Sequence, residues 1–137
     1  METSGPLLLA RETTRSEPVR ILIVDDDAGL RRALVAVFRG DGRYAVQVAG
    51  DGHDGLARVA TFRPHLVLVD LRMPGLDGAD LCRAVKSSPE TRSTRILAMS
   101  GLADGEAEER MLAAGADAFL AKPFTLTQLE AEVARLT

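Results

Sequence analysis

Residues 66–78, LVLVDLRMPGLDG, decide the fold of this chain. The first four are apolar and two of them are β-branched, which is typical of a strand buried on both faces inside a parallel sheet. This run ends at a carboxylate, Asp70, and the Pro and Gly residues that follow predict a loop. Ligands of open α/β sheets bind outside the carboxyl ends of the strands. Asp70 is therefore either a functional carboxylate at that edge or only a cap for the next turn.

Similar apolar runs lie on both sides of this stretch, and segments with helical periodicity separate them. We expect strands at residues 19–24, 44–49, 65–69, 95–99 and 117–121. We expect helices around residues 30–38, 56–62, 81–85, 103–114 and 125–136. Strands that alternate with helices over short connections predict an α/β fold, a doubly wound five-stranded parallel sheet with five helices.

Composition bounds the class of protein. The 137 residues carry a net charge of -3, which argues against a nucleic-acid-binding surface, and no apolar run is long enough to cross a membrane. Cys82 is the single cysteine, so no intrachain disulfide can form and we expect a cytoplasmic protein. Residues 1–18 lack periodicity and are predicted to form a mobile N-terminal tail, which leaves residues 19–137 as one domain.

Polar and charged side chains follow the carboxyl ends of four predicted strands. They are Asp25, Asp26 and Asp27 after the first strand, Asp70 after the third, Ser100 after the fourth and Lys122 after the fifth. Carboxylates that meet at one edge repel each other unless a cation neutralises them, and oxygen ligands of this kind suit Mg²⁺. Lysine suits a phosphoryl oxygen, and a carboxylate is the nucleophile of aspartyl-phosphate chemistry. The set is equipped to make, hold and lose an acyl phosphate.

From about Arg20 to Leu136 the chain resembles the receiver domain of two-component response regulators. The matching motifs are ILIVDDD at 21–27, LVDLRMPGLDG at 68–78, AMSG at 98–101 and AKPF at 121–124. The resemblance implies a flavodoxin-like fold with strand order 2-1-3-4-5 and a receiver domain over residues 19–137. It also implies a signalling switch that changes only its own phosphorylation state and is not otherwise an enzyme.

The same resemblance assigns a phosphoacceptor and a metal site. Asp70 matches the phosphoacceptor, which is also a ligand of Mg²⁺. Asp26 matches a direct metal ligand and Asp25 a ligand that acts through water, whereas Asp27 falls on a position that is not a ligand. The backbone carbonyl of Arg72 matches the remaining protein ligand.

Other matching positions imply how a signal would be passed on. Lys122 matches the catalytic lysine, which is often followed by a cis peptide bond, as Pro123 allows here. Ser100 matches the switch hydroxyl and Phe119 the switch aromatic residue. Phosphorylation would draw Ser100 toward the phosphoryl group, let Phe119 move inward and change the surface formed by the helix near 103–114, the strand 117–121 and the last helix.

The implied partner is a histidine kinase or a histidine phosphotransfer protein. The sequence does not identify the output partner, and the surface just described could also form a homodimer. We also expect Arg72 and Leu102 to slow loss of the phosphoryl group, with Arg72 lying against its oxygens. Gly55, where alanine would favour a helix, is expected to weaken the second helix slightly.

Two alternatives remain open. Asp25-Asp26-Asp27 also fits the D-x-D start of haloacid-dehalogenase-like phosphatases, which use an aspartyl nucleophile, although the chain is short for their larger core. The second alternative is a receiver fold used only as a scaffold. The complete set of acid, hydroxyl and lysine argues against it.

Overall fold

Five parallel strands form one sheet in the computed structural model, which describes residues 17–101 and 103–137. The strands are β1 (Val19–Val24), β2 (Tyr44–Ala49), β3 (Leu66–Asp70), β4 (Arg95–Gly101) and β5 (Ala118–Lys122). The helices are α2 (Ala28–Arg39), α3 (Gly52–Phe62), α4 (Gly78–Ser87), α5 (Ala107–Ala113) and α6 (Leu126–Leu136). The strand order is β2-β1-β3-β4-β5, which confirms the predicted α/β fold. Residues 1–16 of the predicted tail (1–18) lie outside the described residues.

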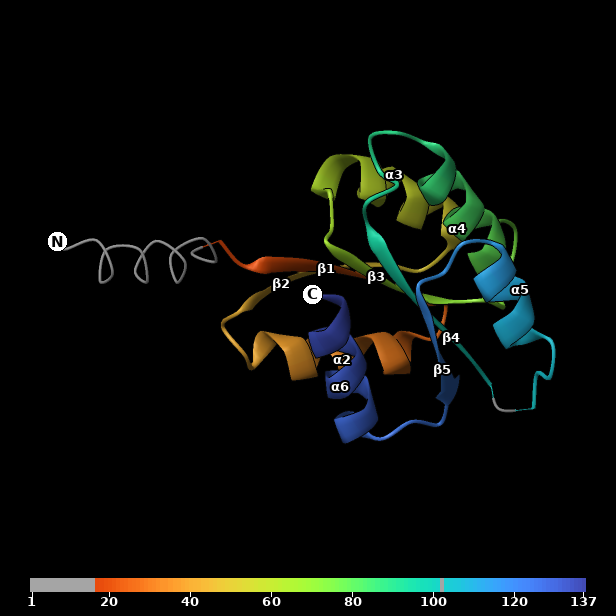
Figure 1. Ribbon diagram of the computed structural model, residues 1–137. Helices are drawn as coiled ribbons and strands as arrows, with labels where there is room; N and C mark the ends of the chain where they lie inside the picture. The colour runs from red at the N-terminus through yellow and green to blue at the C-terminus, as the bar shows by residue number, and fades with distance from the viewer. Residues whose placement is uncertain (1–16, 102) are drawn as a thin grey trace, which may run out of the picture.

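Two layers of helices cover the sheet. Figure 1 shows α3, α4 and α5 on one face and α2 and α6 on the other. The central strand β3 is buried throughout, and its side chains alternate between the two cores. Val67 and Val69 pack toward α3, α4 and α5, whereas Leu66 and Leu68 pack toward α2 and α6. This burial on both faces explains why the sequence shows a continuous apolar run.

The prediction of a helix from residue 103 was wrong at its start, because α5 begins at Ala107. The preceding residues form turns instead. The backbone N–H of Asp104 donates to Gly101 O at 3.0 Å, and its side chain accepts from the N–H of Glu106 at 3.4 Å. An aspartate that bonds its own neighbouring backbone competes with helix formation, so the helix starts later. Strand β4 in turn continues to Gly101, two residues beyond its predicted end.

Gly55 lies where α3 packs closely on the sheet. The absence of a side chain allows this close packing, an effect that helix propensity does not take into account. Gly55 is buried, and a Cβ atom there would lie 2.9 Å from Val24 Cγ1 and 3.0 Å from Leu81 Cδ1. Any larger residue would push α3 away from β1 and α4. The expected loss of helix propensity is therefore accompanied by closer packing.

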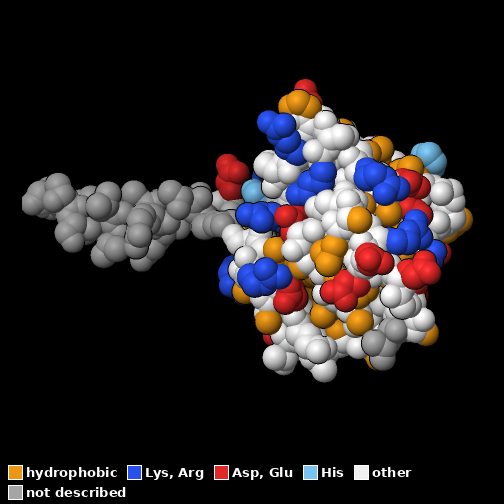
Figure 2. Space-filling view, turned by 45° about the vertical axis from the view of Figure 1, so that its right-hand side comes forward, with side chains coloured by type: hydrophobic (Ala, Val, Ile, Leu, Met, Phe, Trp, Pro, Cys, Tyr) orange, Lys and Arg blue, Asp and Glu red, His pale blue; other side chains and the backbone are white. Residues whose placement is uncertain are grey.

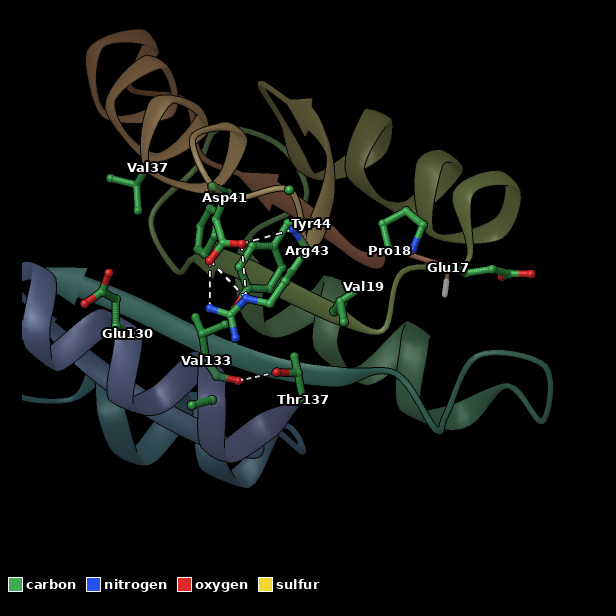
Figure 3. A pocket seen from close by; sticks show the side chains of 13 residues that line it. Glu17, Pro18, Val19, Val37, Asp41, Arg43, Tyr44, Glu130, Val133 and Thr137 are labelled. Carbon is green, nitrogen blue, oxygen red and sulfur yellow. Dashed lines mark hydrogen bonds and ion pairs between the residues drawn. The ribbon is translucent and has the colours of Figure 1, made fainter. Parts of the chain in front are cut away.

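A hollow of about 750 Å³ opens at the end of the molecule opposite to Asp70, between the carboxyl-terminal parts of α2 and α6 (Figure 3). Phe38 and Tyr44 line it, with their rings edge to face at 5.3 Å between centroids. An ion pair between Arg43 and Asp41 also lines it, with 2.7 Å between Nη2 and Oδ2. Tyr44 begins β2, so this hollow lies at the amino ends of the strands and away from Asp70.

Gly78, at the start of α4, allows the helix to approach the end of β3. A Cβ atom at residue 78 would lie 2.4 Å from the backbone oxygen of Asp70. We therefore expect Gly78→Ala to lower the free energy of unfolding by about 1–3 kcal/mol, the usual cost of overpacking. Gly42→Ala is the matched control, since a Cβ there meets nothing within 4 Å, and it should leave stability unchanged or slightly raised. Urea unfolding of both variants tests this; equal stability would show that the contact at residue 78 is not restrictive.

Candidate functional site

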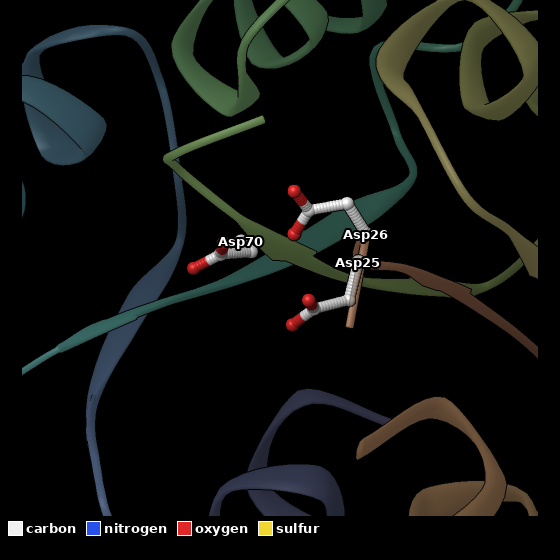
Figure 4. Close-up of side chains that lie close together, drawn as sticks. All are labelled: Asp25, Asp26 and Asp70. Carbon is white, nitrogen blue, oxygen red and sulfur yellow. The ribbon is translucent and has the colours of Figure 1, made fainter. Parts of the chain in front are cut away.

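Three carboxylates gather at the carboxyl ends of β1 and β3 (Figure 4). Asp25 and Asp26 directly follow β1, and Asp70 is the last residue of β3. Each of the three offers an oxygen within 4.8 Å of the others, so the cluster could hold a metal ion. Asp25 is fully buried and Asp70 is buried, whereas Asp26 is exposed. The cluster is thus anchored in the sheet and open to solvent on one side.

Lys122, the last residue of β5, supplies positive charge to this cluster. Its Nζ atom lies 2.9 Å from Asp25 Oδ2 and 3.3 Å from Asp70 Oδ1. Burial lowers the pKa of the Lys122 ammonium, but the hydrogen bond and charge of Asp25 and the charge of Asp70 outweigh it and hold that pKa above its ordinary value. Lys122 therefore stays protonated. The peptide bond to Pro123 is cis, as expected.

Asp70 experiences the opposite balance. Burial raises the pKa of its carboxyl group, the ammonium of Lys122 lowers it, and the negative charges of Asp25 and Asp26 raise it again, so the net shift is upward. The native site thus holds a carboxylate that gains from any added cation. A metal ion at the cluster would supply that charge.

Asp27 takes part in the local structure but not in the cluster. Its carboxylate caps α2 by accepting from the N–H of Gly29 at 2.9 Å and of Leu30 at 3.2 Å. Its own N–H donates to Asp25 Oδ1 at 2.9 Å. Asp27 therefore begins the helix and holds the Asp25 carboxylate in place.

Ser100 and Phe119 lie on neighbouring strands beside the cluster. Ser100 is buried near the end of β4, in register with Ala121 of β5. Phe119, in β5, is half-buried and packs against the core beneath α3, α4 and α5. This core also contains Met111 of α5.

The sequence reasoning missed Asp104. Its Oδ2 atom accepts from Arg72 Nε at 2.6 Å and from Ser100 Oγ at 3.5 Å. The Arg72 guanidinium lowers the pKa of Asp104 below its ordinary value. Arg72 was expected to lie against a phosphoryl group, and its observed pairing was not predicted. The contact joins two loops, and no local pattern relates residues so far apart in sequence. Leu102, expected to act with Arg72, lies outside the described residues.

Comparisons with known proteins agree with this geometry. A family model described as the response regulator receiver domain matches residues 21–134. Response regulator MprA of Mycolicibacterium vanbaalenii is 40% identical over 121 residues, which cover 87% of this chain and 50% of that protein. DNA-binding response regulator MtrA of Mycobacterium tuberculosis is 41% identical over 114 residues, 83% of this chain and 48% of that protein. The chain thus spans about half the length of the curated relatives it matches.

A solved structure with a similar fold contains a metal ion in its cleft. It is the receiver domain of sensor histidine kinase PA1611 from Pseudomonas aeruginosa, which has a magnesium ion coordinated in its active site cleft. The TM-score is 0.80 at 29% identity, over 88% of this chain and 98% of that chain.

Removal of the ammonium should destabilise the site. Lys122→Met leaves the buried carboxylate of Asp25 without its counter-charge, which costs about 3–5 kcal/mol in fully buried pairs. Because the Lys122 side chain is 23% exposed, we expect a loss of about 2 kcal/mol at neutral pH. The pKa of Asp70, already raised, rises further without Lys122, so the native state binds more protons than the unfolded state. The loss should therefore grow as the pH rises from about 4 to 7 and shrink as it falls.

Lys86→Met is the matched control. Lys86 Nζ pairs with Asp117 Oδ2 at 2.9 Å, but that oxygen also accepts from the N–H of Ile96 at 2.8 Å. Lys86 is not among the charged groups that shift the pKa of Asp70, so this loss should not follow the titration of Asp70. Urea unfolding at several pH values measures both variants. A pH-independent loss in Lys122→Met would contradict the charge balance described here.

Proposed function

The chain belongs to the receiver domains of two-component response regulators, and we propose that it accepts a phosphoryl group on Asp70. The observation that carries the proposal is the position of Asp70 between an acidic pair and Lys122, whose Nζ atom lies 3.3 Å from Asp70 Oδ1. In this reaction an Asp70 carboxylate oxygen bonds to phosphorus while the bond from phosphorus to the donor breaks and the donor keeps the electron pair. Water later attacks the phosphorus and gives up a proton to the phosphate or to solvent, while the bond between phosphorus and Asp70 breaks. The carboxylate keeps the electron pair, and inorganic phosphate is released.

A divalent cation fits the residues present. Carboxylate oxygens are hard ligands, and exposed Asp26 leaves space for water and phosphoryl oxygens, which matches the preferences of Mg²⁺. Asp26 and Asp70 would bind Mg²⁺ directly, Asp25 through water, and Arg72 through its backbone carbonyl. When bound, Mg²⁺ neutralises charge on the transferred phosphoryl group. The magnesium in the similar receiver domain of PA1611 supports this choice of metal.

Lys122 and Ser100 would stabilise the product. The protonated Lys122 lies beside Asp70 and supplies a positive charge to one phosphoryl oxygen. Ser100 would donate its hydroxyl proton to another. The shift of Ser100 would let Phe119 move inward, which repacks the surface formed by α5, β5 and α6. Exposed Leu112 and Leu126 belong to α5 and α6 and offer apolar contacts there.

The proposed partner on the input side is a histidine kinase or a histidine phosphotransfer protein. On the output side, the surface of α5, β5 and α6 would contact either another protein or a second copy of this chain. Figure 2 shows acidic and basic side chains intermingled on one face, which favours protein contacts there over a nucleic-acid backbone. Among the described residues, no helix is long and apolar enough to span a membrane.

The proposal predicts that Asp70→Asn abolishes labelling by acetyl phosphate or by a phosphohistidine donor. The amide keeps the shape of the side chain but is not a nucleophile. Asp77→Asn is the matched control, because it removes the same charge nearby while an asparagine can still cap α4. Intact-protein mass spectrometry measures the acyl phosphate. Undiminished labelling of Asp70→Asn would refute the assignment.

The metal site predicts a stabilisation by Mg²⁺ that depends on Asp26. Millimolar Mg²⁺ should raise the Tm of the wild type, because it binds the native state. Asp26→Asn should remove most of this shift, since a charged oxygen ligand is lost. Asp27→Asn should keep it, because asparagine also caps a helix and Asp27 is outside the cluster. Thermal unfolding of both variants with and without Mg²⁺ measures the shift in Tm. Equal shifts in the two variants would exclude Asp26 as a ligand.

A further inference from the structure

Asp104 is fixed in the turn between β4 and α5. Its backbone N–H donates to Gly101 O at 3.0 Å, and its backbone oxygen accepts from the N–H of Ala107 at 3.2 Å. One carboxylate oxygen, Oδ1, accepts from the N–H of Glu106 at 3.4 Å. The side chain is 17% exposed. The turn therefore orients the second oxygen, Oδ2, toward the candidate site.

That second oxygen binds two donors that could also bind a phosphoryl group on Asp70. Arg72 Nε donates to Asp104 Oδ2 at 2.6 Å, and the hydroxyl of Ser100 donates to the same atom at 3.5 Å. Ser100 lies at the end of β4, which pairs with β3, the strand of Asp70. Arg72 follows Asp70 by two residues. Both donors therefore approach one carboxylate, Arg72 from the loop after β3 and Ser100 from the end of β4.

Asp104 restrains both donors. A serine hydroxyl carries a single proton, so Ser100 cannot donate to Asp104 and to a phosphoryl oxygen at once. The Arg72 guanidinium carries five N–H donors, but its Nε atom lies 2.6 Å from Asp104 Oδ2, and this contact directs the side chain at that carboxylate. A phosphoryl group on Asp70 would be an anionic oxygen acceptor of the same kind as the Asp104 carboxylate. The hydroxyl must leave Asp104 to donate to the phosphoryl group, and the guanidinium must loosen its contact with Asp104 to turn toward that group.

We propose that Asp104 is a positioning residue that holds the Arg72 guanidinium and the Ser100 hydroxyl away from Asp70 until phosphorylation. The proposal rests on the proposed function of Asp70. Asp104 stabilises the unphosphorylated arrangement, and the phosphoryl group must displace it to recruit the two donors. Removal of the carboxylate therefore shifts the equilibrium toward the phosphoryl-bound arrangement.

The magnitude follows from the kind of contact that is exchanged. A hydrogen bond in a protein contributes modestly in net terms, and Arg72 is exposed, which weakens its ion pair further. We expect a gain in affinity for a phosphoryl mimic of about three- to tenfold when Asp104 no longer accepts. The Arg72 contact is the shorter of the two and should account for most of the gain.

The experiment measures the affinity of the full chain for beryllofluoride with Mg²⁺, by calorimetric titration. Beryllofluoride is the ligand that activates the DrrB receiver domain, a structural relative of this chain. Asp104→Asn is the main variant, because the amide oxygen can still accept from Glu106 while the amide nitrogen cannot accept from Arg72. Asp104→Ala is a second variant that removes both acceptors. Glu106→Gln is the matched control, because it removes the same charge from the same turn.

The expected result is a three- to tenfold tighter binding in Asp104→Asn and Asp104→Ala, with little change in Glu106→Gln. In a background of Arg72→Ala, Asp104→Asn should give a much smaller gain, since the main donor to be released is absent. An equal gain in Glu106→Gln, no gain in either Asp104 variant, or an undiminished gain without Arg72 would each overturn the proposal. A wild-type chain that binds no beryllofluoride would instead contradict the proposed function of Asp70.

Discussion

The contact between the Lys122 ammonium and two buried carboxylates is the interaction on which the site depends. Asp25 is fully buried, Asp70 nearly so, and exposed Asp26 adds a third negative charge beside them. Such a group is costly to bury unless a cation compensates it, and Lys122 provides one at 2.9 Å from Asp25 and 3.3 Å from Asp70. The parallel sheet brings these residues together, because the carboxyl ends of β1, β3 and β5 lie at one edge. The compensation is incomplete, so the site would gain from a further cation.

The sequence predicted the fold well because burial on both faces leaves an unambiguous pattern. The continuous apolar runs of β1, β3 and β4 cannot be amphipathic surface strands, and the short connections between them leave few topologies. The sequence was less informative where local chemistry competes with periodicity. The apolar spacing after Ser100 predicts a long helix, but the turn around Asp104 delays α5 to Ala107. Gly55 is a second example, because helix propensity does not predict that α3 packs closely on Val24 at this residue.

The candidate site was predictable to the extent that strand ends position it. Asp25, Asp70 and Lys122 each end or follow a strand, so the rule for parallel sheets brings them together without knowledge of any loop. The contact of Arg72 with Asp104 depends instead on the conformations of two loops. Residues this far apart in sequence, on irregular segments, have no periodic relation that sequence reasoning could use. The meeting of these residues at one sheet edge could therefore be predicted from the sequence, whereas Asp104, which we infer to restrain Arg72 and Ser100, required the structure.

The central claim is that Asp70 carries the phosphoryl group within a site completed by Lys122, Ser100 and a divalent cation. A crystal structure of the chain with beryllofluoride and Mg²⁺ tests it most directly. The account predicts beryllium bonded to a carboxylate oxygen of Asp70, Mg²⁺ bound at the cluster of Asp25, Asp26 and Asp70, and the side chains of Lys122 and Ser100 in contact with fluorine atoms. Beryllofluoride on another residue, or an adduct on Asp70 that neither Lys122 nor Ser100 contacts, would contradict it.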